Sequence, residues 1–167
     1  MHTGLYVIMG VSGSGKTTIG AQLARALDVP FIDGDDLHPP ANVERMAAGI
    51  PLTDEDRRPW LLAIAARLRE AQRAARGLVV ACSALKRRYR DLLRSAGAAE
   101  VRFVYLRGNR TLLAERMTHR RGHFMPTALL ESQLATLEEP ATDEDAWVCD
   151  IGATPDAIVA DLVTRSA

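Results

Sequence analysis

Residues 10–18, near the start of the chain, form the segment with the clearest chemistry. Residues 10–17 read Gly-Val-Ser-Gly-Ser-Gly-Lys-Thr and match the phosphate-binding pattern G-x-x-x-x-G-K-[ST] at every fixed position. The glycines allow backbone conformations in which successive N–H groups point at phosphate oxygens. Lys16 is expected to reach the β- and γ-phosphates of ATP, and the Thr17 hydroxyl to sit on Mg²⁺. The predicted ATP-binding residues of this segment are Gly10, Val11, Ser12, Gly13, Ser14, Gly15, Lys16, Thr17 and Thr18.

A chance Gly/Ser-rich turn is the alternative interpretation of this segment. It is disfavoured because the segment lies between an apolar run and an amphipathic stretch, as the pattern requires. We therefore also predict Lys16 to be catalytic.

An acidic group follows the next apolar run, with Asp33, Asp35 and Asp36 within four residues. In an extended strand end, Asp33 and Asp35 point to the same side. One acid near Mg²⁺ and another accepting the proton of an attacking hydroxyl is a plausible division. The third apolar run ends Ala81-Cys82-Ser83 without an acid, so we predict Asp33, with Thr17, at the metal and Asp35 as the base. A solvated acidic turn that caps the next helix is the alternative.

Short apolar runs and longer amphipathic stretches must position these residues. Strands are predicted at 5–9, 30–32, 78–82, 101–106 and 146–148, and helices at 16–27, 54–75, 85–96, 109–121, 127–137 and from residue 154. The apolar runs are nearly continuous, which is typical of parallel strands buried on both faces. The alternation predicts an α/β fold, a three-layer doubly wound parallel sheet of five strands, whose ligands bind beyond the carboxyl ends of the strands.

The composition is that of an ordinary globular chain, with 47% hydrophobic and 25% charged residues over 167 positions, which suits one domain at 1–167. The 21 Lys and Arg balance 21 Asp and Glu, which argues against a nucleic-acid partner. The sequence contains no apolar run near the roughly 20 residues that cross a membrane, and 5–9 is too short for a signal-peptide core. Cys82 and Cys149 are expected to be buried thiols in a reducing cytoplasm rather than a disulfide.

Five further blocks resemble the signature of the gluconokinases, the compact P-loop family that phosphorylates D-gluconate. They are residues 31–39, 49–61, 82–90, 121–125 and 133–140, and they cover nearly the whole chain in the right order. The resemblance implies ATP:D-gluconate 6-phosphotransfer with Mg²⁺. It also implies a P-loop fold like that of nucleoside monophosphate and shikimate kinases, and often a homodimer.

A sugar acid needs a cation for its carboxylate and polar groups for its hydroxyls. The resemblance gives the following candidates for residues that bind the sugar acid: His38, Arg57, Arg58, Lys86, Arg87 and Arg90. Arg58 and Lys86 are favoured, because each lies in a matching block beside an element that is expected to face the cleft. The predicted substrate-binding residues are Asp35, His38, Arg58, Ser83, Lys86 and Arg87.

The basic residues after the third strand have a second interpretation, in which they form the solvent-exposed face of an amphipathic helix and have no binding role. That helix, 85–96, is expected to turn Arg87, Arg88 and Arg90 outward. For Arg88 the solvent-exposed interpretation is favoured. For Lys86 and Arg87 the solvent-exposed and the substrate-binding interpretations are supported equally. Ser83 could equally cap the helix.

A lid is predicted around residues 116–126, where arginines could close over the triphosphate and stabilise charge. Arg116 and Arg120 are four apart and share a helix face, so both are predicted to be catalytic and Arg120 also to bind ATP. His119 and His123 have the same spacing, but zinc is disfavoured because a third ligand is missing nearby. Finally, residues 150–155 form the turn after the last strand, and in this fold such a turn commonly packs the adenine. Asp150 could equally be an ordinary turn residue.

The competing functions are kinases of the same fold that act on shikimate, adenylylsulfate or a nucleoside monophosphate, and a non-catalytic nucleotide sensor. Residues 37–39 and 57–60 point away from shikimate kinases. A sensor would have no use for the acidic loop or the arginines of the lid, so a kinase for gluconate is the favoured interpretation.

Overall fold

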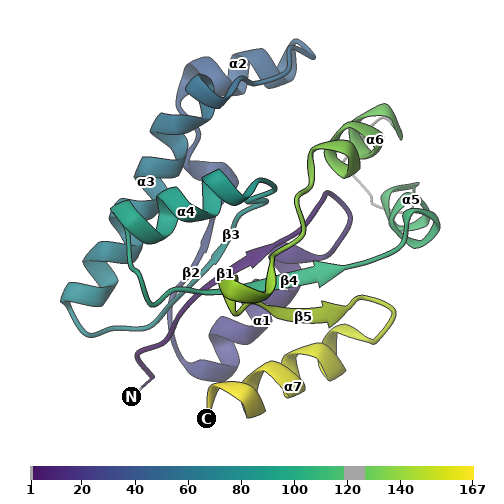
Figure 1. The fold of residues 1–167 in the computed structure, drawn as a ribbon. Helices are drawn as coiled ribbons and strands as arrows, with labels where there is room; N and C mark the ends of the chain where they lie inside the picture. The colour runs from purple at the N-terminus through teal and green to yellow at the C-terminus, as the bar shows by residue number, and fades with distance from the viewer. Residues whose placement is uncertain (1, 119–126) are drawn as a thin grey trace.

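Five parallel strands form the centre of the computed structural model, which describes residues 2–118 and 127–167 (Figure 1). Their order in the sheet is β2-β3-β1-β4-β5. The strands are β1 (Leu5–Met9), β2 (Phe31–Asp33), β3 (Leu78–Ala81), β4 (Arg102–Arg107) and β5 (Trp147–Asp150). The predicted five-stranded parallel sheet is therefore confirmed, with strand ends shifted by one or two residues.

The central strand β1 is buried along its whole length, as its continuous apolar sequence predicts. Val7 lies opposite Val80 of β3 on one side and Phe103 of β4 on the other. Because all neighbours run parallel, the carboxyl ends of β1, β2 and β3 meet at one edge of the sheet. The Gly10 N–H there donates to the Ser83 carbonyl at 3.3 Å, which joins the segments that follow β1 and β3.

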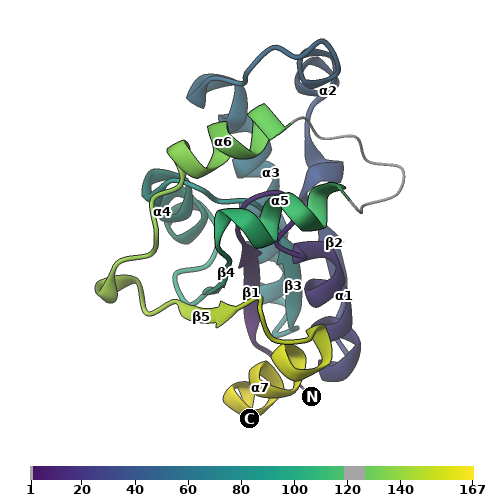
Figure 2. The same cartoon turned by 90° about the vertical axis from the view of Figure 1, so that its right-hand side faces the viewer.

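Helices cover both faces of the sheet and build two apolar cores. On one face, α3 (Asp54–Arg73) and α4 (Arg87–Ala96) pack over side chains such as Val7 and Val80. On the other, α1 (Lys16–Leu27) and α7 (Pro155–Ser166) pack over Ile8, Val79 and their neighbours. Figures 1 and 2 show both layers and place the two helices α5 (Arg110–Thr118) and α6 (Thr127–Thr136) beyond the ends of the strands.

The start of α3 is fixed by a reciprocal cap. The Thr53 hydroxyl accepts from the Asp56 N–H at 3.1 Å, and the Asp56 carboxylate accepts from the Thr53 N–H at 2.9 Å. Before it, the 3₁₀ helix η1 (Gly34–Leu37) and the helix α2 (Pro40–Ala47) follow β2. The helix α2 was not among the predicted helices and was considered only as what an acidic turn might cap. The helix α4 begins at Arg87 instead of 85, because Lys86 has an extended backbone (φ −106°, ψ 146°) and is the N-cap of this helix.

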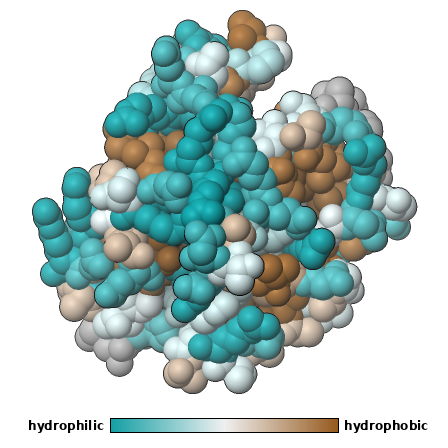
Figure 3. Space-filling model, in the orientation of Figure 1, coloured by the Kyte–Doolittle hydropathy of each residue, from teal (hydrophilic) through white to brown (hydrophobic). Residues whose placement is uncertain are grey.

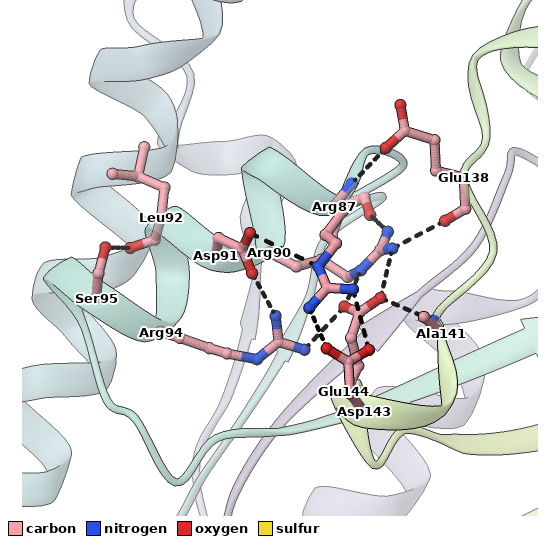
Figure 4. A network of polar contacts seen from close by, with 11 residues as sticks. Arg87, Arg90, Asp91, Leu92, Arg94, Ser95, Glu138, Ala141, Asp143 and Glu144 are labelled. Atoms are coloured by element: carbon pink, nitrogen blue, oxygen red, sulfur yellow. Dashed lines mark hydrogen bonds and ion pairs between the residues drawn. The ribbon is translucent and has the colours of Figure 1, made fainter.

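The prediction that Arg90 points outward is wrong, because Arg90 is 0% exposed (Figure 4). Its guanidinium donates to Glu144 at 2.7 Å and 3.1 Å, to the Ala84 carbonyl at 2.8 Å and to the Glu138 carbonyl at 2.9 Å. The segment after α6, which includes the 3₁₀ helix η2 (Thr142–Glu144), passes beside the start of α4 and supplies partners of this side chain (Figure 4). Burial opposes ionisation of the Glu144 carboxylate and raises its pKa. The hydrogen bond from Arg90 has the opposite effect and helps to lower the pKa of Glu144 to about 2.

Both cysteines are buried and free, as predicted. Burial raises the pKa of the Cys82 thiol to about 12, so it stays protonated and unreactive at neutral pH. Within residues 2–118 and 127–167, none of the helices combines the length and apolar character needed to cross a membrane.

Candidate active site

The phosphate-binding segment forms a loop between β1 and α1. Gly13 and Gly15 have φ values of 84° and 94°, a left-handed region that favours glycine. A side chain at Gly13 would also lie 2.9 Å from Met117 Cγ and 3.2 Å from the Leu113 carbonyl, so α5 packs directly on the loop. The Lys16 ammonium donates to the Val11 carbonyl at 3.2 Å and is thereby held over the loop.

A cavity of about 440 Å³ opens on this loop. Its lining consists of residues 12–19 of the loop and α1, Asp33 at the end of β2, Asp35 of η1, Ala81, Arg116 of α5, and Ala153, Pro155 and Ile158 near the start of α7. Its size and position suit a nucleotide at the carboxyl edge of a parallel sheet. In the space-filling view the molecule is notched above this edge, between the arm formed by α2 and α3 and the surface of α6 (Figure 3).

One buried hydroxyl on the cavity wall points to a polar ligand. Ser14 is 1% exposed, and its Oγ has no hydrogen-bond partner in the described part of the chain. Buried polar atoms are rarely left without a partner, and a phosphate oxygen in the cavity would satisfy this one.

The two predicted metal ligands lie together. The Thr17 hydroxyl donates to Asp33 Oδ2 at 3.4 Å, and both residues line the cavity. The other oxygen, Oδ1, accepts from the Asp35 N–H at 3.1 Å, so Asp33 also caps η1. A hydroxyl and a carboxylate beside a phosphate site fit Mg²⁺, which takes few protein ligands and keeps several waters. Within residues 2–118 and 127–167, no group of three or more His, Cys, Asp or Glu side chains is arranged to hold a metal ion.

Asp35 also lines the cavity, on a backbone that is closely held. A side chain at its neighbour Gly34 would lie 2.5 Å from the Ala81 carbonyl, so η1 is pressed against β3. The Gly34 carbonyl accepts a buried hydrogen bond from Trp60 Nε1 at 2.7 Å. The sequence thus brings Asp33 and Asp35 to the same cavity, as predicted, and Trp60 of α3 anchors the turn that carries them.

His38 lies next to this anchor. Its ring stacks on Trp60, with centroids 4.2 Å apart and an angle of 12° between the planes. Burial, aided by the charge of Arg57, lowers the pKa of His38 to about 4, so the ring is neutral at pH 7. A neutral imidazole can donate a hydrogen bond to a hydroxyl and accept one from it, but it carries no positive charge to offset the charge of a carboxylate.

The other predicted substrate ligands are placed differently from one another. The backbone carbonyl of Ser83 accepts the hydrogen bond from the Gly10 N–H of the phosphate loop. The Lys86 Nζ lies 4.0 Å from Asp54 Oδ1. Arg87 forms a bidentate pair with Asp143 at 3.0 Å and 2.6 Å (Figure 4). Among the predicted substrate ligands only Asp35 lines the cavity, and His38, Arg58, Ser83, Lys86 and Arg87 do not. Arg58 is exposed and lies two residues before buried Trp60, on the opposite side of α3.

Arg116 lines the same cavity as Asp35 and donates to the Ile151 carbonyl at 2.5 Å. It therefore joins α5 to the turn before α7, whose residues Ala153 and Pro155 form the adjoining wall. Arg120, the rest of the predicted lid at residues 119–126, and the pair His119 and His123 lie outside the described residues.

Gln133 is a site residue that the sequence reasoning missed. Its side-chain oxygen accepts from the Ser12 N–H at 2.7 Å, so α6 holds the phosphate loop directly. The signal was present in the sequence, because Leu130, Gln133, Leu134 and Leu137 follow helical spacing and only Gln133 among them is polar.

We predict that Gln133→Leu raises the KM for ATP by about 10-fold, the scale expected when a partly buried N–H loses its acceptor. Steady-state kinetics with ATP varied at saturating phosphoryl acceptor would measure this. Ser132→Ala, at the exposed neighbouring position, is the matched control and should leave the KM for ATP within about twofold. An unchanged KM for ATP in Gln133→Leu would show that the contact is dispensable for nucleotide binding.

Known proteins are similar to this chain in sequence and in fold. Residues 5–140 match the family described as an AAA domain. The chain is 44% identical to the thermoresistant gluconokinase of Escherichia coli strain K12, over 95% of this chain and 91% of that protein. It is 49% identical to the gluconokinase of Gluconobacter oxydans strain 621H, over 94% of this chain and 88% of that protein. The crystal structure of a gluconokinase from Sinorhizobium meliloti 1021 superposes with a TM-score of 0.89 at 48% identity, covering 99% of this chain and 92% of that one.

Proposed function

The chain belongs to the gluconokinase family, and we propose on this basis that it transfers the γ-phosphoryl group of ATP to the 6-hydroxyl of D-gluconate. The observation that carries the proposal is the cavity in which Asp33 and Asp35 face the phosphate loop. A loop that binds a triphosphate and a carboxylate that can accept a proton are the two parts that phosphoryl transfer to a hydroxyl requires.

The transfer follows from these parts. The 6-hydroxyl oxygen attacks the γ-phosphorus while the bond from that phosphorus to the β–γ bridging oxygen breaks, which leaves ADP. Asp35 takes the proton of the hydroxyl. Lys16 and the N–H groups of the loop stabilise the negative charge on the transferring group, in a site whose donors are already in place.

Thr17 and Asp33 are the residues that would hold Mg²⁺. The ion would supply positive charge that neutralises part of the charge of the phosphates. The contact between Thr17 and Asp33 supports this assignment, because it joins a hydroxyl and a carboxylate at the cavity wall.

The remaining assignments rest on the cavity and on the family. Ala153, Pro155 and Ile158 form the wall suited to the adenine, and Arg116 supplies a cation from α5 to the phosphates. Arg120 belongs with Arg116 in a lid over residues 116–126 of a single domain, 1–167. A homodimer in the cytoplasm completes the proposal, and the two free cysteines suit a reducing compartment.

The test is ADP release with D-gluconate, shikimate, glycerate and nucleoside monophosphates offered separately. We expect turnover on D-gluconate, and a ³¹P NMR signal of the product split by two protons, as in a phosphate on a terminal CH₂. Turnover on shikimate or a nucleotide but not on D-gluconate would overturn the assignment. ATP binding without turnover on any acceptor would favour the non-catalytic sensor.

A further inference from the structure

A buried arginine ties the segment after α6 to the start of α4 (Figure 4). Arg90 donates to the Glu138 carbonyl, just after α6, and to the carboxylate of Glu144 in η2. A third bond goes to the Ala84 carbonyl, before α4. The side chains of Arg90 and Glu144 are 0% and 1% exposed, so this attachment is shielded from water. Arg90 does not line the cavity, and any role in the reaction must therefore act through other residues.

Glu138 is the residue on which this attachment converges. Its N–H donates to the Leu85 carbonyl at 2.7 Å, and its carbonyl accepts from Arg90 at 2.9 Å. Its side-chain oxygen Oε1 accepts from the Arg87 N–H at 3.0 Å. We call these three hydrogen bonds the Glu138 junction. Because both backbone groups and the carboxylate are bound, the chain that leaves α6 cannot shift along α4 without breaking several bonds together.

Helix α6 connects the Glu138 junction to the phosphate loop. Its hydrogen-bonding pattern continues to Leu137, whose N–H donates to the Gln133 carbonyl at 2.9 Å. Gln133 therefore lies on the same helix, about one and a half turns before Glu138. Its side-chain oxygen accepts from the N–H of Ser12, a residue of the cavity wall. The junction and the phosphate loop are thus the two ends of a short, continuous series of contacts.

Further contacts of α6 constrain its position less strictly. The helix lies beyond the ends of the strands and packs against α5 (Figures 1 and 2). Buried Leu130 belongs to the same apolar core as Leu113 and Met117 of α5, but apolar packing has no preferred direction. Glu131 pairs with Arg110 at 3.0 Å, yet both side chains are largely exposed, and such pairs contribute little. The directional hydrogen bonds of the Glu138 junction therefore do most to fix the orientation of α6 over the loop.

We propose that Glu138 and Arg90 are positioning residues for nucleotide binding. They hold α6 in the place where Gln133 meets the Ser12 N–H, and this contact keeps the phosphate loop in its binding conformation. A loop that is already ordered binds phosphate more tightly, because less conformational freedom is lost on binding. This role rests on the nucleotide-binding part of the proposed function and is independent of which acceptor receives the phosphoryl group.

A purely structural role is the alternative interpretation of the pair formed by Arg90 and Glu144. A buried ion pair is seldom needed for stability alone, since apolar side chains of similar size often replace it without loss. A structural role would change the melting temperature of a variant and leave its nucleotide affinity unchanged. A positioning role changes the affinity even in a variant that is fully folded, and only as long as Gln133 is present to transmit the change.

The experiment measures the dissociation constant of ADP by isothermal titration calorimetry in the presence of Mg²⁺. Glu138→Ala removes the acceptor of the Arg87 N–H at an exposed position, so the protein should stay folded. We expect the dissociation constant to rise about 3- to 10-fold, the effect of one lost hydrogen bond. Glu138→Gln keeps an oxygen at the same place and should stay within about twofold of wild type.

Glu139→Ala is the matched control, because Glu139 is the neighbouring exposed acid and pairs with Arg107 of β4 instead of with α4. It should leave the dissociation constant of ADP within about twofold of wild type, as most surface substitutions do.

A double-mutant cycle tests the route through Gln133. In a Gln133→Leu background, Glu138→Ala should change the dissociation constant of ADP by less than about twofold, because the contact through which it acts is already absent. Equal effects of Glu138→Ala with and without Gln133, or no effect in either background, would overturn the proposal.

Replacement of the buried pair separates position from stability. Arg90→Met combined with Glu144→Leu should keep the protein folded but weaken ADP binding about 10-fold, because the Glu138 carbonyl loses a charged donor. Wild-type affinity in this folded variant would contradict the role of Arg90, and if the variant does not fold, the Glu138→Ala cycle still decides the proposal. A wild-type protein that binds ADP but does not phosphorylate D-gluconate would count against the proposed function and leave this test intact.

Discussion

Lys16→Ala is expected to lower kcat on D-gluconate by about 10³-fold or more, while the protein stays folded. Lys16 lines the cavity at the first position of α1, and its ammonium is held over the loop by the Val11 carbonyl. A preformed cation aimed at a transferring phosphoryl group stabilises the charge of the transition state, and a single lost donor of this kind costs about 10²- to 10³-fold. Lys16 acts on the transferring group itself, so the loss should reach the upper end or exceed it.

Measurement of ADP release, together with thermal unfolding, would test this prediction. Alanine is a good helix former at the start of α1, so the melting temperature should change little. Lys16→Arg is the informative companion, because it keeps the charge but replaces a compact ammonium with a larger planar group. It should also lose most activity. A kcat for Lys16→Ala within tenfold of wild type would show that the loop binds ATP without this cation taking part in transfer.

The parts of the site predicted from the sequence are those in which local pattern decides the geometry. The residues of the phosphate loop are contiguous, so their relative positions follow from one turn between a strand and a helix. Asp33 ends β2 and Asp35 comes two residues later. This strand lies two places from β1 in the sheet, and parallel strands bring their carboxyl ends to one edge. The contact between Thr17 and Asp33 follows from these two facts together.

The parts that the sequence did not reveal depend on segments far apart in the chain. Arg90 has the spacing of a surface residue, but the segment from Glu138 to Glu144 covers it and supplies its partners. Gln133 and Ser12 are 121 residues apart, so their hydrogen bond has no local signature beyond a polar residue in an apolar stripe. The sequence of one helix does not show which distant segment packs against it.

The different burial of Arg57 and Arg58 has the same origin. Both lie in a block that resembles the family, and neighbouring positions on a helix differ by about 100° in direction. The rotation of α3 is set by Trp60, whose Nε1 bonds to the Gly34 carbonyl and whose ring stacks on His38. Arg57 lies on the same face of α3 as Trp60, and its Nη1 donates to the Tyr89 hydroxyl at 3.1 Å, whereas Arg58 is exposed.

This geometry makes Asp35→Asn the substitution that tests the base most directly. We expect it to lower kcat on D-gluconate by on the order of 10²-fold or more, the usual scale for loss of a general base. Asparagine has nearly the same size and can keep its place beside Asp33, but it cannot take the proton of the 6-hydroxyl. The KM for ATP should change little, because the N–H groups and Lys16 of the loop remain.

Asp36→Asn is the matched control, since Asp36 is an exposed acid of the same 3₁₀ helix and does not line the cavity. It should keep kcat within about twofold of wild type, as most surface substitutions do. Asp33→Asn separates the two cavity acids, because loss of a metal ligand should raise the Mg²⁺ concentration needed for half-maximal rate. If Asp35→Asn retained a near-normal kcat and Asp33→Asn did not, the proton would leave through Asp33, and η1 would serve only to hold that residue in place.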